Sequence, residues 1–117
     1  MKKNIQDRTF DFAVIILDAY FILREKGHYK LSEQLVKSGT SIGANVEEAQ
    51  AAHSKADFIN KLTIANKEAR ETRYWIRLFN RKELLLDFPS YEYISKEIEE
   101  IILILNSIIK KSRSNLS

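Results

Sequence analysis

The sequence predicts an all-α protein, an antiparallel up-down-up-down four-helix bundle that forms one domain over residues 1–117. Three observations predict this fold. The chain has only 3 Gly and 1 Pro in 117 residues, a length that suits one core. Four segments of roughly 20 residues carry helical periodicity and are joined by short links. No alternation of the kind that strands show runs for a useful length.

The first two helices have clear expected ends. The first is expected from about Gln6 to Lys26 and ends at Gly27, because glycine most readily takes the left-handed conformation after a helix. The second is expected from an N-cap at Ser32 to about Ala52. Its narrow apolar face holds Leu35, Ile42, Val46 and Ala49, and Gly39 and Gly43 beside it favour close helix packing.

The third and fourth helices are separated by Asp87, Pro89 and Ser90. Ser54 and Asp57 resemble a capping box that opens the third helix, which should reach about Asn80. One stripe follows steps of four and three: Phe58, Leu62, Ala65, Ala69, Thr72, Ile76 and Phe79. Proline is tolerated in the first turn of a helix, so the fourth helix should start near it and run to about Arg113.

Two segments carry more apolar surface than one bundle helix normally buries. Between Phe10 and Leu23 the first helix has charged residues only at Asp11 and Asp18. In the fourth helix, residues 101–105 are all Ile or Leu and cover more than one turn. We therefore expect self-association through these two helices, the alternative being irregular packing that hides them within one chain.

Composition bounds the compartment and the partners. The chain has no cysteine, so a reducing, cytoplasmic location is expected. The apolar stretch from Phe12 to Leu23 is interrupted by Asp18 and is shorter than the roughly 18 residues that span a bilayer, so no membrane partner is expected. A net charge of +3 and a pI near 9.1 permit contact with nucleic acid without requiring it.

The sequence shows no known pattern of catalytic or cofactor-binding residues. A two-metal bundle site needs two Glu-x-x-His pairs, and only Glu25 and His28 have that spacing, with Gly27 between them. There is no cysteine nucleophile and no glycine-rich phosphate loop. We therefore expect no enzyme, no catalytic residue, no metal and no cofactor, while a carboxylate site assembled in space stays a third possibility.

One face of the third helix is basic. Lys67, Arg70, Tyr74, Arg77 and Arg81 lie within a sector of about 80°, about 150° from the apolar stripe. Cations interleaved with an aromatic ring suit RNA or single-stranded DNA, where a base can stack. These five residues are called the basic face. The alternative is a solvated helix surface with intrahelical pairs such as Lys67 with Glu71.

The second helix carries a polar strip beside its apolar face. Ser38, Ser41, Asn45 and Glu48 step by three, four and three residues. Burying them requires partners. We favour hydrogen bonds to a neighbouring helix or subunit, with a basic partner for Glu48; a binding site for a ligand or another protein is the alternative.

Three sequence blocks resemble a known family. They are residues 38–49 (SGTSIGANVEEA), 54–58 (SKADF) and 71–75 (ETRYW). They resemble the four-helix-bundle proteins encoded by intervening sequences in bacterial 23S rRNA genes, to which the accessory protein of diversity-generating retroelements is related. The positions that fit its pattern are Ser41, Ile42, Asn45, Glu48, Ser54, Phe58, Ala65, Glu71, Thr72 and Trp75. Ala49 departs from the glycine common in relatives, a change that suits a helix interior.

The resemblance implies an antiparallel bundle, ring-like pentamers and no enzyme. In the retroelement branch, it also implies a basic surface that binds nucleic acid and engages a reverse transcriptase. For this chain we expect a homo-oligomer that contacts RNA or single-stranded DNA through the basic face. A scaffold that binds another protein, without a nucleic-acid role, is the alternative.

Overall fold

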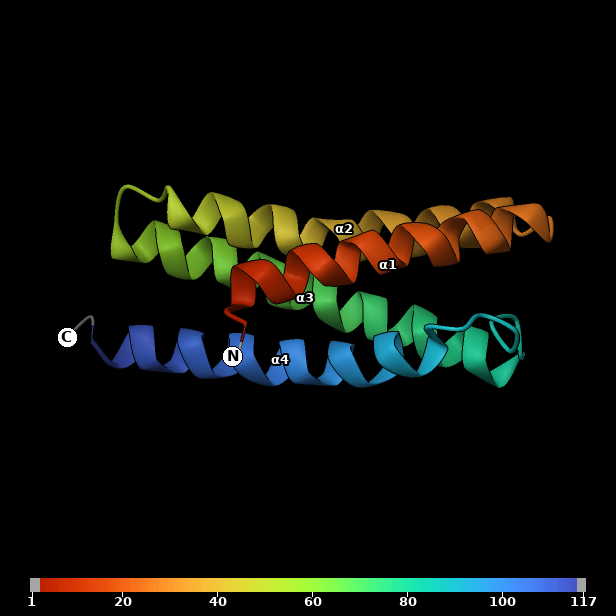
Figure 1. Cartoon of the computed structure of the whole chain (residues 1–117). Coiled ribbons are helices and arrows are strands. Elements are labelled where there is room, and N and C mark those ends of the chain that lie inside the picture. The colour runs from red at the N-terminus through yellow and green to blue at the C-terminus, as the bar shows by residue number, and fades with distance from the viewer. Residues whose placement is uncertain (1–2, 116–117) are drawn as a thin grey trace.

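The computed structural model describes residues 3–115, which form four α-helices and no strand. The helices are α1 (Ile5–Glu25), α2 (Tyr29–Gln50), α3 (Lys55–Arg81) and α4 (Tyr91–Ser114). They lie side by side along one long axis (Figure 1). The predicted all-α four-helix bundle is therefore confirmed.

Helix α1 begins and ends where its sequence predicts. The Asn4 side chain accepts a hydrogen bond from the Asp7 amide at 2.9 Å and so caps the first turn. The helix ends at Glu25, and Gly27 follows with a φ of 90°. That angle lies in the left-handed region, which glycine enters without strain.

Helix α2 begins three residues before the predicted N-cap, and the assignment of Ser32 as that cap is wrong. The N-cap is His28, whose carbonyl accepts from the Ser32 amide at 2.9 Å and closes the first turn. Ser32 is buried inside this turn, and its hydroxyl donates to the Tyr29 carbonyl at 2.7 Å. Leu31, on the same turn, packs against the core, so tertiary burial starts the helix early.

Helix α3 begins as predicted, and α4 follows a turn-rich link. The Ser54 hydroxyl accepts from the Asp57 amide at 3.0 Å, which confirms Ser54 as the N-cap. Helix α3 continues to Arg81, and the link contains Glu83 with a positive φ of 58°. Pro89 lies before the N-cap Ser90, two positions before Tyr91, the first residue of α4, and so outside the first turn.

Contacts between α1 and α2 show that these two helices run antiparallel. Helices α1 and α2 approach closely at two glycines. A Cβ built on Gly39 would lie 2.8 Å from Ile16 Cγ2, and one on Gly43 would lie 3.3 Å from the Thr9 carbonyl oxygen. Both contacts pair later residues of α2 with earlier residues of α1. The predicted role of these glycines in close helix packing is confirmed.

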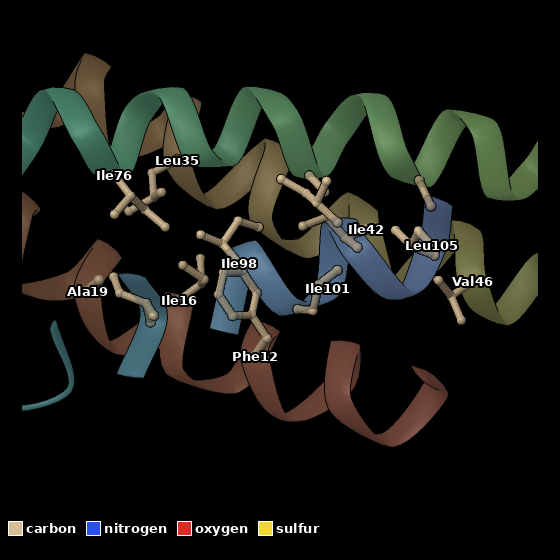
Figure 2. Packing of buried hydrophobic residues seen from close by; sticks show 14 of the residues in the cluster. Phe12, Ile16, Ala19, Leu35, Ile42, Val46, Ile76, Ile98, Ile101 and Leu105 are labelled. Carbon is tan, nitrogen blue, oxygen red and sulfur yellow. The ribbon is translucent and has the colours of Figure 1, made fainter. Parts of the chain in front are cut away.

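One hydrophobic cluster draws side chains from all four helices. The predicted apolar residues of α2 are buried, as is the α3 stripe, apart from the half-buried Phe58. Figure 2 shows Phe12 and Ile16 of α1 close to Ile98 of α4, and Leu35 of α2 beside Ile76 of α3. Three of the five consecutive apolar residues of α4, Ile101, Ile102 and Leu105, belong to this cluster.

The apolar excess of α1, in contrast, remains on the surface. Phe10, Val14, Leu17 and Phe21 form a stripe along its outer side, with Phe10 63% and Phe21 60% exposed. We call these four residues the α1 stripe. On α4 only Leu103 stays strongly exposed, at 64%. The chain therefore buries most of the apolar excess of α4 by itself, but it leaves that of α1 exposed.

Helix α1 is tied to the rest of the bundle at both of its ends. The Arg8 guanidinium donates to both carboxylate oxygens of Glu97 on α4, at 2.9 and 2.6 Å. At the other end, the Lys26 ammonium donates to the Leu84 carbonyl at 3.0 Å and to Asp87 at 2.6 Å. Helix α1 starts part-way along the bundle, so one end of the molecule contains only α2, α3 and α4 (Figure 1).

No helix within residues 3–115 combines the length and the apolar character needed to cross a membrane.

Candidate nucleic-acid interface

The basic face lies on the outside of α3. All five of its residues are exposed, including Tyr74 at 55%. The opposite side of α3 is the buried stripe that contains Ala69 and Ile76. The helical geometry inferred from the sequence therefore holds, because burial of one side of α3 directs the basic side to solvent.

The four cations of the basic face take part in no ion pair among residues 3–115. The salt bridges in this part of the chain involve other cations, namely Lys3, Arg8, Lys26, Lys61 and Arg73. Glu71, the carboxylate that could pair with Lys67 one turn away, accepts instead from Trp75 Nε1 at 3.0 Å. The positive charge of this face is therefore not neutralised by the bundle.

Tyr74 is held by a short aromatic series. Its ring meets the Trp75 ring edge-on, with centroids 5.1 Å apart. Trp75 in turn stacks on Phe79 at 6.2 Å, and Phe79 is fully buried. The exposed ring thus rests on the core through Trp75, which gives it a fixed place between Arg70 and Arg77.

Polar contacts between α3 and α4 fix the flank of the basic face. Asn66 Nδ2 donates to Asn106 Oδ1 at 2.6 Å, and Arg73 donates to Glu99 at 3.2 Å. Asn80 adds a longer contact to Ser95 at 3.4 Å. These contacts set which turns of α4 lie beside the basic face.

Two hollows open along this side of the molecule. The first, about 610 Å³, is lined by Tyr74, Arg77 and Arg81 together with Leu78 and Asn80. The second, about 260 Å³, lies between α3 and α4 and is lined by Thr63, Asn66, Lys67, Arg70, Asn106, Ile109 and Arg113. The structure therefore divides the five predicted residues between two neighbouring depressions.

Sequence reasoning missed the residues that join the basic face from other positions. Leu78 and Asn80 flank it on α3, and Asn106 and Arg113 come from α4. The positive charge of Arg113 was visible in the sequence, at a helix end where it also suits the helix dipole. Its position next to Lys67 depends on how α3 pairs with α4, which periodicity within one helix cannot show.

The polar strip of α2 lies beside α3, and its members make contacts within the bundle. The buried Ser38 hydroxyl shares a hydrogen bond with Thr72 of α3 at 2.9 Å. Ser41 donates to the Lys37 carbonyl at 2.6 Å, and Asn45 donates to the Ser41 carbonyl at 2.9 Å. Glu48 lies 3.5 Å from the Lys61 ammonium of α3. These contacts satisfy the strip without an external ligand.

The carboxyl groups of Glu68 and Glu71 lie near each other on α3. Burial raises the pKa of the Glu68 carboxyl, and the nearby Glu71 carboxylate raises it further. Glu68 is half-buried, and its carbonyl accepts a hydrogen bond from Thr72. Across residues 3–115, no three His, Cys, Asp or Glu side chains are grouped as metal ligands would be.

Comparison with known proteins places the chain in a family. The model of the family described as 23S rRNA-intervening sequence protein matches residues 1–107. The chain belongs to this family. The resemblance seen in the three sequence blocks is thereby confirmed.

A solved structure of similar sequence supports this assignment. This chain is similar to a crystallised member of the S23 ribosomal protein family from Bacteroides thetaiotaomicron, described as having unknown function. The two share 47% sequence identity and a TM-score of 0.85, over 92% of this chain and 99% of that chain. No curated protein matches the chain. The family thus establishes the architecture, and the function must be argued from the surface.

Proposed function

We propose that this protein is a non-catalytic, oligomeric, cytoplasmic binding protein that contacts RNA or single-stranded DNA through the basic face of α3. One observation carries the proposal: four cations that make no ion pair with any described residue flank an exposed tyrosine on one side of one helix. From Lys67 to Arg81 this face extends about 21 Å along the helix at 1.5 Å per residue. That length accommodates several consecutive phosphates.

Binding would combine charge neutralisation with stacking. Phosphates that approach Arg70, Arg77 and Arg81 release condensed counterions, which favours association at low salt. Tyr74 offers a ring on which an unpaired base can stack. Such a base is available in a single strand and not inside a duplex, so the face suits single strands.

The basic face is tested by removing its charge without touching the core. In the triple variant Arg70→Gln, Arg77→Gln and Arg81→Gln, all three changes are at exposed positions. Fluorescence anisotropy with a labelled single strand of about 12 nucleotides, over about 50 to 200 mM salt, measures affinity and its salt dependence. We expect weaker binding and a slope of log K against log salt that is less steep by about 2, since each single-strand phosphate contact contributes about 0.7.

A charge-matched control separates this site from a general effect of net charge. The variant Lys30→Gln, Lys37→Gln and Lys111→Gln removes the same formal charge from exposed positions elsewhere. It should keep most of the affinity. If both triple variants bind like the unchanged protein, or lose affinity equally, the basic face is not the site. A scaffold that binds another protein would then become the leading function.

The proposed oligomer rests on the α1 stripe. Four large apolar side chains in a row on a protein surface usually mark an interface, and α1 presents them on the side away from the core. Neighbouring copies of the chain around such an assembly would bury them. We therefore propose that copies of the chain associate through α1, as pentamers by resemblance to the family.

A further inference from the structure

The hollow between α3 and α4 has the chemistry of an anion site. Its charged lining residues are all cations: Lys67 and Arg70 from α3, and Arg113 from α4. No Asp or Glu side chain lines it. Within residues 3–115, none of these three cations takes part in an ion pair. Three unpaired cations around one hollow favour an anionic occupant.

The neutral lining residues add a hydrogen-bond donor. The side-chain oxygen of Asn106, Oδ1, accepts a hydrogen bond from Asn66 Nδ2 at 2.6 Å. This bond does not use the Asn106 NH2 group, which is left to donate. The hollow measures about 260 Å³, which is several times the roughly 30 Å³ that one water occupies in the liquid. It therefore has room for a phosphodiester group and its first waters.

We infer that this hollow is a phosphate-binding subsite that Lys67, Arg70, Asn106 and Arg113 form jointly for the backbone of a bound single strand. The inference rests on the proposed function and extends it from α3 onto α4. Arg113 is the residue that it adds, because a guanidinium matches the paired oxygens of a phosphate.

Continuity with the basic face favours a nucleic-acid strand over a free anion. Arg70 belongs both to the hollow and to the basic face, and Tyr74 lies one helical turn beyond it. A strand whose base stacks on Tyr74 therefore places a neighbouring phosphate near Arg70. From there the backbone continues into the hollow toward Arg113.

The test compares two exposed cations near the end of α4. Arg113→Gln removes a charge from the hollow, and Lys111→Gln removes one from a residue that does not line it. With a labelled oligouridine RNA of about 12 nucleotides, Arg113→Gln should weaken binding about tenfold at low salt. It should also make the salt slope less steep by about 0.7. Lys111→Gln should change affinity by less than about twofold.

A second variant tests the same hollow without changing its shape. Asn106→Asp keeps the oxygen that accepts from Asn66 and places a carboxylate beside the three cations. We expect it to weaken RNA binding at least as much as Arg113→Gln. Arg113→Lys, which keeps the charge, should recover part of the affinity. Thermal unfolding followed by circular dichroism should give the same Tm for the Arg113 and Lys111 variants.

The outcomes separate this inference from the proposed function. If the Arg70, Arg77 and Arg81 triple variant binds weakly while Arg113→Gln behaves like Lys111→Gln, the subsite is overturned and the basic face stands. If the triple variant also binds normally, both are overturned. Inorganic phosphate is the second probe. In one outcome, adding phosphate shifts NMR signals in the unchanged protein but not in Arg113→Gln, while Arg113→Gln keeps its RNA affinity. That pair of results would assign the hollow to a free anion and overturn the strand assignment.

Discussion

The two glycines of α2 show how single residues decide the spacing of helices. At Gly39 an added Cβ would fall 2.8 Å from a methyl group of Ile16, a residue with no exposed surface. At Gly43 the nearest atom would be the Thr9 carbonyl oxygen at 3.3 Å. Neither side chain nor backbone can move far in a packed interior. Helices α1 and α2 are therefore held close by the absence of side chains at these positions.

The variant Gly39→Val should destabilise the protein. Its branched side chain would overlap Ile16, and overpacking of a core costs about 1 to 3 kcal/mol. Urea unfolding followed by circular dichroism measures the loss in free energy of unfolding. Ala44→Val is the control, because Ala44 is exposed on the same helix and the change costs less than about 1 kcal/mol in helix propensity. Equal stability of the two variants would contradict close packing at Gly39.

At the scale of the helix, a serine side chain caps α3 but not α2 or α4. Ser54 accepts from the Asp57 amide, whereas the N-cap residues of α2 and α4, His28 and Ser90, make no side-chain cap bond. The first turn of α3 therefore depends on one hydroxyl, and those of α2 and α4 depend on packing. Helix ends of these two kinds should respond differently to substitution.

We expect Ser54→Ala to lower the free energy of unfolding by about 1 kcal/mol, the usual effect of losing an N-cap oxygen. Ser54→Asp keeps an acceptor at the cap and should preserve stability. Ser90→Ala removes a hydroxyl that makes no cap bond and should have a smaller effect than Ser54→Ala. Chemical denaturation of the three variants measures the difference, and a larger loss at Ser90 would contradict the assignment of the caps.

The elements also show what sequence can and cannot predict. Local signals sufficed at Gly27 and Ser54, because a left-handed glycine and a serine cap act within one turn. The start of α2 was missed, since burial of Ser32 and the packing of Leu31 outweighed the capping preference of serine. The basic face followed from the period of one helix. The position of Arg113 beside Lys67 and Arg70 could not be predicted in this way, because it depends on the register between α3 and α4.

At the scale of the whole molecule, the largest apolar surface left exposed on one helix is the α1 stripe. The fourth helix buries most of its apolar residues inside the chain, but α1 leaves four of its own outside. This distribution favours α1 as the main contact surface of the proposed oligomer. It also places the proposed assembly surface on a different helix from the basic face of α3, so association would leave that face open.

Replacing the two phenylalanines of this stripe should dissociate the proposed oligomer. The double variant Phe10→Ser and Phe21→Ser changes only exposed side chains, so each bundle should remain folded. Light scattering after size-exclusion chromatography should give the mass of an assembly of several chains for the unchanged protein and a smaller mass for the variant. The Tm of the unchanged protein should rise with concentration, because association stabilises the folded state by mass action. A single-chain mass for the unchanged protein would contradict the oligomer.

The short first helix has a consequence for the geometry of such an assembly. Helix α1 is offset from α4 along the long axis, so α1 covers only part of the length of the bundle (Figure 1). Copies joined through α1 would therefore touch over only that part of their length, and the same contact repeated would turn each added copy by the same angle. Repeated rotation of this kind returns to its origin when the angle divides a full circle. A closed ring, the arrangement that the resemblance to the family implies, therefore requires an α1 contact whose rotation angle divides a full circle.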